Sequence, residues 1–398
     1  MTAKLLIYCP AMTRMRGGIE RLVADILNAN LPCLQDHTVH VVSHNRGDLS
    51  ATIPVFELPS SVDVSALNFG LREDRIAELR RFLVDEGITH VVVMDASPVF
   101  AQFLLATEGL NVPILLSEHF EPSRSAMQLK DPSLREKILS LADGIHFLLP
   151  SYSASKPKSF NGRSFVIENS VGKPERLANV TVSNRNGRFS LINVARLHFW
   201  QKRQDVLVKA FARIADKHPM WDLKLWGDVH NKKDYDKLSN LVSDSGLTSR
   251  VFFGKSLGHS ELLEEIQNSH LFVIPSDFEG SPISLAEALV HGLPAVGFSE
   301  CPGVNEVIRH GYNGFLALGL GDPKSLSECL DILIRSTRLR SEFSANAATL
   351  SDVRAPSKIM SDWETLLAWF TSTKKPLRNS HPDAKRILLS TKQELLPD

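Results

Sequence analysis

The chain has 398 residues, of which 43% are hydrophobic and 23% are charged, a balance typical of a globular protein long enough for two cores. Lysine plus arginine and aspartate plus glutamate each number 45, so the net charge is zero and no global positive field favours nucleic acid. No apolar run is long enough to span a membrane, and residues 4–9 are too short for a signal peptide.

These bounds predict a cytoplasmic protein whose membrane contact, if it has any, is peripheral. The four cysteines form no C-x-x-C pair, which favours reduced thiols in the cytosol over a disulfide framework.

Strand and helix patterns alternate through the first part of the chain. The helix candidates begin near residue 19, where apolar residues recur at helical spacing, and at residues 72–86. The strand candidates are residues 5–9, 39–43, 88–94, 113–119, 144–150 and 164–168. This alternation predicts an α/β fold with a doubly wound parallel sheet.

A second alternating series follows a polar, turn-rich stretch. Its strand candidates are residues 190–197, 223–226, 251–254, 271–275, 294–298 and 314–318. We therefore expect two Rossmann-like doubly wound domains facing across a cleft. The carboxyl ends of their strands would line this cleft, which is the usual ligand position in such folds. The expected divisions are residues 1–172 for the first domain, 173–188 for a linker, 189–355 for the second domain, 356–373 for a C-terminal helix and 374–398 for a poorly ordered, mildly basic tail.

Two carboxylates flank a predicted helix start in the second domain. Ser281 is a good N-cap residue and Pro282 suits the first helical position. Glu279 then lies in the loop before the helix, and Glu287 about one and a half turns into it. Free backbone N–H groups of the first turn, around Ile283, would attract an anion such as a diphosphate. The alternative is a capped surface helix with two solvated glutamates.

A pair of cations precedes another helix in the same domain. Arg196 ends a predicted strand, and Lys202 lies just before a helix predicted at residues 205–217. A cation near a helix N-terminus opposes the helix dipole, which makes sense if an anion binds between them. Arginine and lysine together suit a pyrophosphate, although each alone is more often a solvated surface charge.

These motifs together resemble a known enzyme family. The Glu-x7-Glu motif with its EG-x-P core, the Arg-Leu-x4-Lys stretch and Gly17-Gly18-Ile19-Glu20-Arg21 are similar to those of retaining glycosyltransferases of family 4, which have the GT-B fold. The match runs in order through segments 292–296, 303–308 and 311–316. Ala195, where the family usually has glycine, and segment 169–172 depart from its pattern.

The resemblance implies roles for particular residues. Arg196 and Lys202 would neutralise the leaving diphosphate, Glu279 would orient the sugar and Glu287 would hold the ribose. The binding site for the diphosphate would be lined by Ser281, Pro282 and Ile283.

In the first domain, Gly17 and Gly18 would approach the donor closely, and His119 would contact the transferred sugar. From the residues alone, the glycines could form an ordinary turn and His119 could be capped or solvated. The resemblance also implies that helix 356–373 crosses back to the first domain.

Metal and redox motifs are weak in this sequence. Asp234-Tyr235-Asp236 has the form of a metal-binding D-x-D, but the lysines around it predict the start of a polar surface helix. No G-x-G-x-x-G follows the first strand, and no histidine and cysteine cluster has zinc spacing. We therefore expect no metal and no cofactor, only a nucleotide-diphosphate sugar as donor substrate.

The resemblance and the residues together predict a retaining hexosyltransferase. It would transfer a hexose from a UDP- or GDP-sugar to a hydroxyl of a cell-surface glycan or glycolipid precursor, such as lipopolysaccharide or capsule. Arg14, Arg16 and Arg21 near the expected cleft suggest a membrane-bound acceptor. The alternatives are transfer to a small soluble acceptor, and a non-catalytic scaffold that binds sugar nucleotides.

Overall fold

A computed structural model describes residues 2–13, 17–44, 53–69, 72–95, 98–127, 129, 131–229 and 231–395. The chain divides into two compact units, which are described separately below. The first unit comprises residues 1–169 and 357–398, and the second comprises residues 170–356.

The first unit contains a seven-stranded parallel sheet in the order β3-β2-β1-β4-β5-β6-β7, as far as the described residues show. Its strands are β1 (Lys4–Tyr8), β2 (Thr38–His44), β3 (Asp63–Leu67), β4 (His90–Val93), β5 (Ile114–Glu118), β6 (Gly144–Phe147) and β7 (Arg163–Val166). The order reverses between β1 and β4, which makes the sheet doubly wound, as predicted. Edge strand β3 was not predicted from the sequence.

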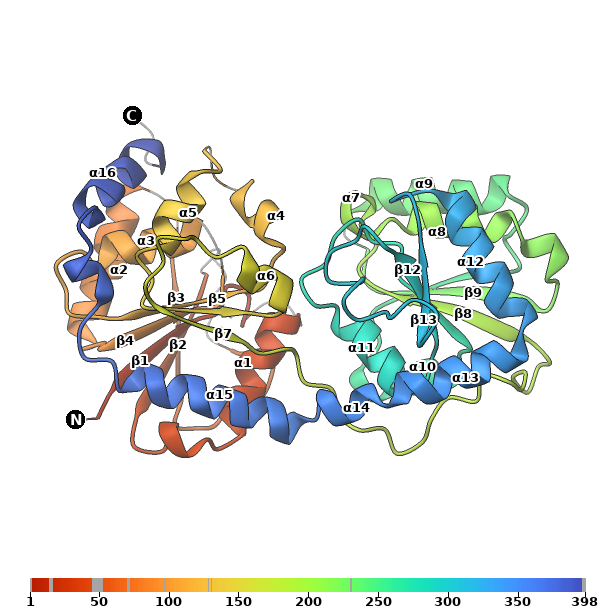
Figure 1. Cartoon of the computed structure of the whole chain (residues 1–398), viewed down its shortest axis with the longest axis horizontal. Coiled ribbons are helices and arrows are strands. Elements are labelled where there is room, and N and C mark those ends of the chain that lie inside the picture. The colour runs from red at the N-terminus through yellow and green to blue at the C-terminus, as the bar shows by residue number, and fades with distance from the viewer. Residues whose placement is uncertain are drawn as a thin grey trace. The chain divides into compact units, whose positions relative to one another are not determined.

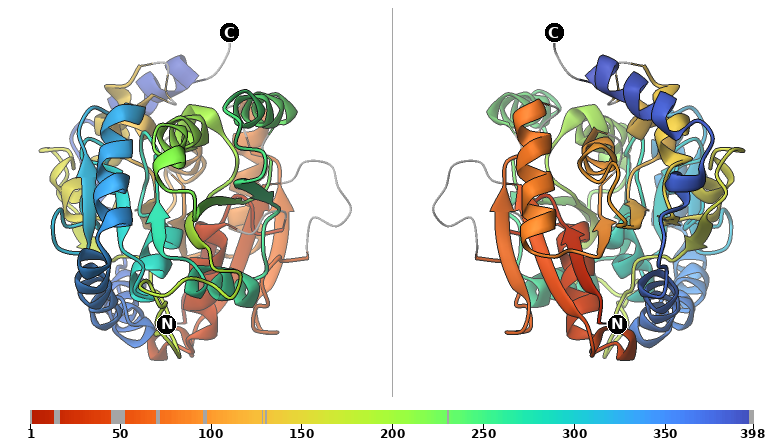
Figure 2. Two further views of the ribbon diagram at one scale, coloured as in Figure 1. Left: turned by 90° about the vertical axis from the view of Figure 1, so that its right-hand side faces the viewer. Right: turned by 90° about the vertical axis from the view of Figure 1, so that its left-hand side faces the viewer.

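Helices cover both faces of this sheet, which faces the viewer in the right-hand part of Figure 2. They are α1 (Gly18–Asn28), α2 (Glu73–Asp85), α3 (Pro98–Ala106), α4 (Pro122–Ala126), α5 (Leu134–Leu139), α6 (Pro150–Ala154), α15 (Pro356–Thr371) and α16 (Ala384–Leu395), with short 3-10 turns η1 (Pro32–Leu34) and η3 (Leu377–Ser380). Side chains alternate along β1: Leu5 and Ile7 pack into one core, and Leu6 and Tyr8 into the other. This alternation follows from the two-residue period of a strand.

The end of the chain belongs to the first unit (Figure 1). Helix α15 buries Trp363, Leu366 and Phe370 in the same core as α1. The expected disorder of residues 374–398 is wrong for the described part, because α16 packs against α3 and α5 and buries Ile387 and Leu388.

A buried ion pair holds the approach to α16. The Arg378 guanidinium lies 3.4 Å from an Asp143 carboxylate oxygen, and both side chains are almost fully buried. Arg378 also donates to the carbonyls of Thr107 and Val112. These contacts give residues 374–380 a fixed position against the sheet.

The second unit contains a six-stranded parallel sheet in the order β10-β9-β8-β11-β12-β13 within the described residues. Its strands are β8 (Phe189–Val194), β9 (Trp221–Trp226), β10 (Val251–Gly254), β11 (Leu271–Val273), β12 (Ala295–Phe298) and β13 (Gly314–Ala317). Its helices are α7 (Phe199–Lys202), α8 (Gln204–Ala212), α9 (Lys232–Asp244), α10 (His259–Gln267), α11 (Ile283–Val290), α12 (Pro323–Arg335), α13 (Thr337–Ala348) and α14 (Leu350–Val353), and η2 (Ala215–Lys217) is a 3-10 turn.

The order of this sheet reverses between β8 and β11, so it is doubly wound as well. Two Rossmann-like α/β sheets were predicted, and both are confirmed. Residues 173–188, expected to form a linker, contain no helix or strand, and Ala178 and Val180 are buried in the second core. No helix in the described parts of the chain is long and apolar enough to cross a membrane.

Candidate active site

Lys202 and Glu279 form a close ion pair in the second unit. The Lys202 Nζ atom lies 2.7 and 2.8 Å from the two carboxylate oxygens of Glu279. Only 17% of the lysine side chain and 6% of the glutamate side chain are exposed. Lys202 ends α7 just before α8, and Glu279 lies in the loop before α11, as the sequence predicted for both residues.

Further contacts hold together the two segments that carry this pair. The Nη1 atom of Arg203 lies 3.0 Å from both carboxylate oxygens of Asp277. The backbone N–H of Asp277 donates to the carbonyl of Gln201, and the Gln201 side chain donates to the carbonyl of Phe278. Because three consecutive residues on each side are tied to the other segment, Lys202 and Glu279 are held opposite each other.

Arg203 and Gly303 allow the chain to turn sharply around the pair. Arg203, between α7 and α8, has a φ of +48°, an uncommon left-handed conformation for a residue with a side chain. Gly303 has a φ of +80°, and a Cβ atom there would lie 2.6 Å from the carbonyl oxygen of Glu279. Only glycine fits this position, which explains its place in segment 303–308.

Helix α11 begins one residue later than the sequence predicted. The expected N-cap Ser281 precedes the observed cap residue, Pro282, and the first helical residue is Ile283. The correction has a physical reason: Pro282 has an extended ψ of 109°, so it lies outside the helix. The N-terminus of α11 still follows Glu279 directly, and Ser281 and Pro282 are buried beside it.

The first turn of α11 is fixed to the end of β8. The Ser284 hydroxyl donates to the carbonyl of Val194, the last residue of β8, over 3.0 Å. Arg196 lies two residues farther along and is exposed, and its carbonyl accepts a hydrogen bond from the Gln204 side chain. The positive end of α11 and Arg196 therefore both lie where the strand order reverses, the usual ligand position in this type of sheet.

Glu287 is buried in α11, with 3% of the residue exposed. One of its carboxylate oxygens lies 3.9 Å from Nδ1 of His259, the first residue of α10. The carbonyl of Glu287 accepts a hydrogen bond from Nδ1 of His291, and burial lowers the pKa of His291. His259 was not predicted as a site residue, because nothing local links residue 259 to residue 287.

A cavity of about 530 Å³ opens at the carboxyl ends of β8, β9 and β10. Its lining includes Trp226, Asp228, Tyr235 and Lys255. A Cβ atom at Gly254 would overlap the Trp226 ring, so glycine allows that ring to lie flat against the strand. The cavity was not predicted, because its walls come from three strands and two helices that are distant in sequence.

The remaining predicted site residues lie in the first unit. Gly17 precedes α1, Gly18 is its first residue, and His119 directly follows β5. All three lie at the carboxyl edge of one sheet, where β4 separates β1 from β5. A Cβ atom at Gly17 would lie 2.4 Å from the carboxylate of Glu20, so a larger residue would displace that buried side chain. Arg14 and Arg16 lie outside the described residues.

His119 is 8% exposed, and its Nε2 lies 2.8 Å from the Ser117 hydroxyl. Burial, with a smaller contribution from His146, lowers the pKa of His119 to about 3. The imidazole is therefore neutral near neutral pH. It is suited to hydrogen bonding and not to carrying charge.

Asp234 lies in the first turn of a surface helix, as predicted. Its backbone N–H donates to the Asn231 side chain, and its carboxylate accepts from the backbone N–H of Phe199. In the described parts of the chain, no three histidine, cysteine, aspartate or glutamate side chains are grouped as metal ligands.

Residues 179–350, nearly the whole second unit, match the family model of glycosyl transferases group 1. The second unit is therefore similar to the glycosyl transferases of this group. An uncharacterized glycosyltransferase from Haemophilus influenzae is 24% identical over 357 residues, which cover 88% of this chain and 96% of that protein.

Two further proteins are similar to this chain, one in part of its sequence and the other in its fold. A Campylobacter jejuni N-acetylgalactosaminyltransferase named for a diphospho-undecaprenol-linked sugar is 38% identical over 89 residues, or 22% of this chain and 23% of that protein. Anabaena HepE in complex with UDP and glucose has a TM-score of 0.70 at 18% identity, covering 92% of this chain and 99% of HepE. The GT-B fold expected from the sequence is thus confirmed.

Proposed function

We propose that this protein is a retaining glycosyltransferase of family 4 that transfers a hexose from a nucleotide-diphosphate sugar. The observation that carries the proposal is the buried Lys202–Glu279 pair, 2.7 Å apart at the N-terminus of α11. A cation for phosphate and an acceptor for sugar hydroxyls lie side by side there. A diphosphate sugar needs both groups at the point where its phosphate and sugar meet.

The diphosphate would bind to the N-terminus of α11. Free N–H groups of the first helical turn and the helix dipole attract anions. Lys202 and Arg196 would add two positive charges. During the reaction negative charge builds on the leaving diphosphate, and fixed positive groups stabilise that charge more than they stabilise the ground state.

The nucleoside would extend from the diphosphate toward β8, β9 and β10. Glu287 is a buried acceptor for the two hydroxyls of a ribose. The cavity beside Trp226 and Tyr235 has the volume and the aromatic lining that suit a nucleobase. HepE was solved with UDP and with glucose, which supports a UDP-sugar as the first donor to test.

In the proposed reaction, the acceptor hydroxyl oxygen attacks the anomeric carbon from the face that the diphosphate leaves. The bond from that carbon to the phosphate oxygen breaks, and a phosphate oxygen takes the acceptor proton. Because attack and departure share one face, the anomeric configuration is retained. Glu279 would orient the sugar, and Lys202 would neutralise the diphosphate, so the chain's own cations make a divalent metal unnecessary.

The proposed acceptor is a hydroxyl of a glycan or of a lipid-linked sugar at a membrane surface. The C. jejuni relative acts on a diphospho-undecaprenol-linked sugar according to its name, and Arg21 lies on α1 near Gly17 and Gly18. Lipid-linked acceptors and anionic vesicles at low salt test this part of the proposal. Efficient transfer to a free sugar with no vesicle binding would contradict it.

The decisive experiment has two stages. A thermal-shift screen of nucleoside diphosphates and their sugars identifies the donor, because a ligand at a hundred times its dissociation constant adds about 2.7 kcal/mol of stability. Proton NMR of the product formed from that donor then reports the anomeric configuration. Inversion would refute the retaining mechanism, and nucleotide binding without transfer or donor hydrolysis would favour a non-catalytic scaffold.

A further inference from the structure

A histidine lies beside the buried carboxylate of Glu287 in the second unit. Helices α10 and α11 lie next to each other in this unit (Figure 1), and His259 is the first residue of α10. The Glu287 side chain is 4% exposed, whereas the His259 side chain is 57% exposed. The pair therefore combines a buried acceptor with a ring that a ligand can reach.

The distance between the two groups suits a hydroxyl that both of them contact. Nδ1 of His259 lies 3.9 Å from a carboxylate oxygen of Glu287, which is too far for a direct hydrogen bond. Two hydrogen bonds of about 2.8 Å that meet at one oxygen, at an angle of about 90–110°, span about 4.0–4.6 Å. One hydroxyl oxygen therefore fits between the two groups with little adjustment.

The two neighbours also restrict the chemistry of the ligand atom between them. A carboxylate only accepts hydrogen bonds, so the ligand must donate to Glu287. Nδ1 of a histidine donates in one neutral tautomer and in the protonated ring, so the same ligand atom can accept from His259. A hydroxyl does both, whereas a carbonyl or an ionised phosphate only accepts.

The chain around both residues leads to the cavity at the carboxyl ends of β8, β9 and β10. Lys255, in the wall of that cavity, comes four residues before His259. Ser284 lies one helical turn before Glu287 on the same face of α11, and it donates to the carbonyl of Val194, whose two neighbours in the chain also line the cavity. The bridging hydroxyl would thus belong to a ligand whose other part occupies the cavity.

Other titratable groups next to the pair are already engaged. The Glu261 carboxylate accepts from the backbone N–H of Gly258 at the start of α10. His291 contacts the carbonyl of Glu287 through its Nδ1, and burial lowers the pKa of His291, so this ring is neutral near neutral pH. His259 is therefore the histidine suited to share a ligand with the Glu287 carboxylate.

We propose that His259 is a specificity-determining residue of the donor site, whose Nδ1 shares one ribose hydroxyl of the nucleotide with the Glu287 carboxylate. This inference rests on the proposed function, which assigns Glu287 to the ribose. It adds a residue that lies outside the Glu-x7-Glu motif, and both residues belong to the second unit. The site selects a ribonucleotide over a deoxyribonucleotide, because only the hydroxyl can bridge the two groups.

Calorimetry with deoxy nucleotides tests the shared hydroxyl in the full-length protein. The probes are UDP, 2′-deoxy-UDP and 3′-deoxy-UDP, with the GDP series in their place if the thermal-shift screen selects GDP. We expect His259→Ala to weaken binding of the ribonucleotide by about five- to tenfold, the effect of one hydrogen bond. For the deoxy nucleotide that lacks the shared hydroxyl, the variant and the unaltered protein should have equal Kd values.

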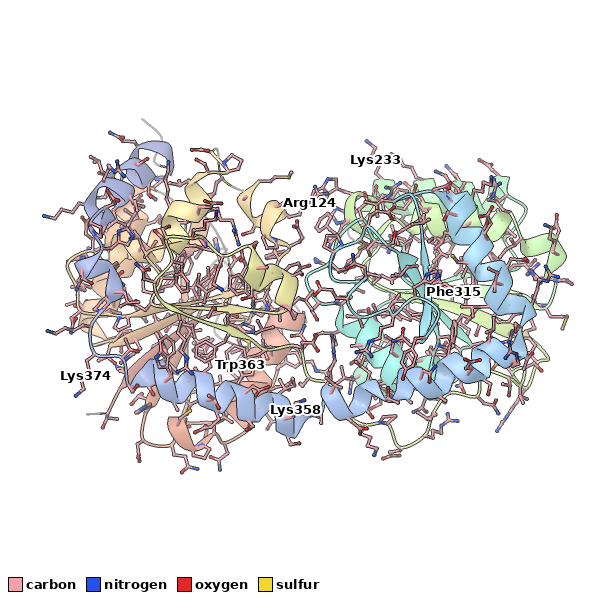
Figure 3. All side chains as sticks on the ribbon, in the orientation of Figure 1. Arg124, Lys233, Phe315, Lys358, Trp363 and Lys374 are labelled. Atoms are coloured by element: carbon pink, nitrogen blue, oxygen red, sulfur yellow. The ribbon has the colours of Figure 1, made fainter. Side chains whose placement is uncertain are left out.

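Two further variants separate a lost contact from a disturbed fold. His259→Asn should keep most of the affinity, because the asparagine amide nitrogen can donate from a position close to that of Nδ1. His310→Ala is the matched control, because His310 is exposed in the same unit but packs against Phe315 of β13 (Figure 3), with the ring centroids 5.2 Å apart. The cavity walls come from other strands, so this variant should bind UDP as the unaltered protein does.

Steady-state kinetics give a second measure of the contact. His259→Ala should raise the KM for the donor sugar by a similar factor and leave kcat close to normal, because the contact exists before and during the reaction. A loss of kcat at unchanged KM would contradict the assignment of His259 to the ribose.

The binding data distinguish failure of this inference from failure of the proposed function. Unchanged UDP binding in His259→Ala, or an equal loss with UDP and with both deoxy nucleotides, would overturn the role of His259 alone. If the unaltered protein bound no nucleoside diphosphate at all, the proposed function would fail and the inference would fail with it.

Discussion

Removal of the Glu279 carboxylate tests the ion pair on which the proposed donor site depends. In Glu279→Ala, the Lys202 ammonium loses the ion-pair partner that it has among the described residues, and its side chain, 17% exposed in the unaltered protein, stays largely covered. Breaking a fully buried pair costs about 3–5 kcal/mol, chiefly because an uncompensated charge stays out of water. Since 17% of Lys202 is exposed, we expect a loss of about 2–3 kcal/mol.

Nucleoside diphosphate should recover much of this loss. Its phosphates would supply Lys202 with the negative charge that the variant lacks, so the stabilisation by nucleotide should be at least as large as in the unaltered protein. Turnover should fall, because the sugar loses the group that orients it. Denaturant unfolding with and without nucleotide, and calorimetry for binding, measure the two effects.

Asp277→Ala is the matched control. It removes a neighbouring ion pair, to Arg203, whose side chains are 20% and 28% exposed, so its cost should be only about 1 kcal/mol. Nucleotide should not compensate that smaller loss. In the Lys202→Ala/Glu279→Ala double variant, the loss should be smaller than the sum of the single losses. Additive losses in the double variant would refute the reasoning. A loss of nucleotide binding in Glu279→Ala as large as the loss in Glu287→Ala would refute it as well.

Further predictions address the ribose, the metal, the C-terminal segment and pH. Glu287→Ala should raise the KM for the donor by about tenfold or more, because it removes charged hydrogen bonds worth about 1.5–3 kcal/mol that exist before and during the reaction; a fall in kcat alone in steady-state kinetics would contradict this. Transfer should continue in excess chelator, and loss of turnover that magnesium or manganese restores would show that the proposed metal independence is wrong. Arg378→Ala should destabilise the first unit by about 3 kcal/mol in denaturant, because Asp143 would stay buried without its cation, and an unchanged midpoint would count against that pair. Burial lowers the pKa of His146 to about 4 from an ordinary 6.5, so below pH 6.5 this ring takes up a proton when the first unit unfolds. The first unit should therefore lose about 2 kcal/mol of stability between pH 7 and pH 5 because of this residue. His146→Gln should flatten that pH dependence, and an unaltered slope would contradict the prediction.

The sequence predicts the apolar elements well, because their periodicity is local. Leu22, Val23 and Ile26 recur at helical spacing and all three are buried on one face of α1. Edge strand β3 has a weaker signal, since its run is short and all its residues are at least partly exposed. It pairs with β2 because β2 offers a free edge, and that edge exists only in the folded sheet.

The sequence identifies Lys202 and Glu279 by their positions before helices, but not their contact. The two residues are 77 positions apart, and each motif is also compatible with a solvated charge. The same holds for the C-terminal segment, whose basic composition suggested a disordered tail. Its order depends on Asp143, which is 235 positions away from Arg378.

The C-terminal segment does more than cover the first sheet. Arg378 ties it to Asp143, the residue directly before β6, and Trp363 packs on His146, which lies in β6 itself. Both contacts therefore act on one strand, next to the strand that carries Ser117. Because the Ile167 carbonyl and the Trp363 ring both contact His146, the position of this ring depends in part on a helix that follows the second sheet in the sequence. The surroundings of Ser117 and His146 are thus built from parts of the chain that no local motif connects.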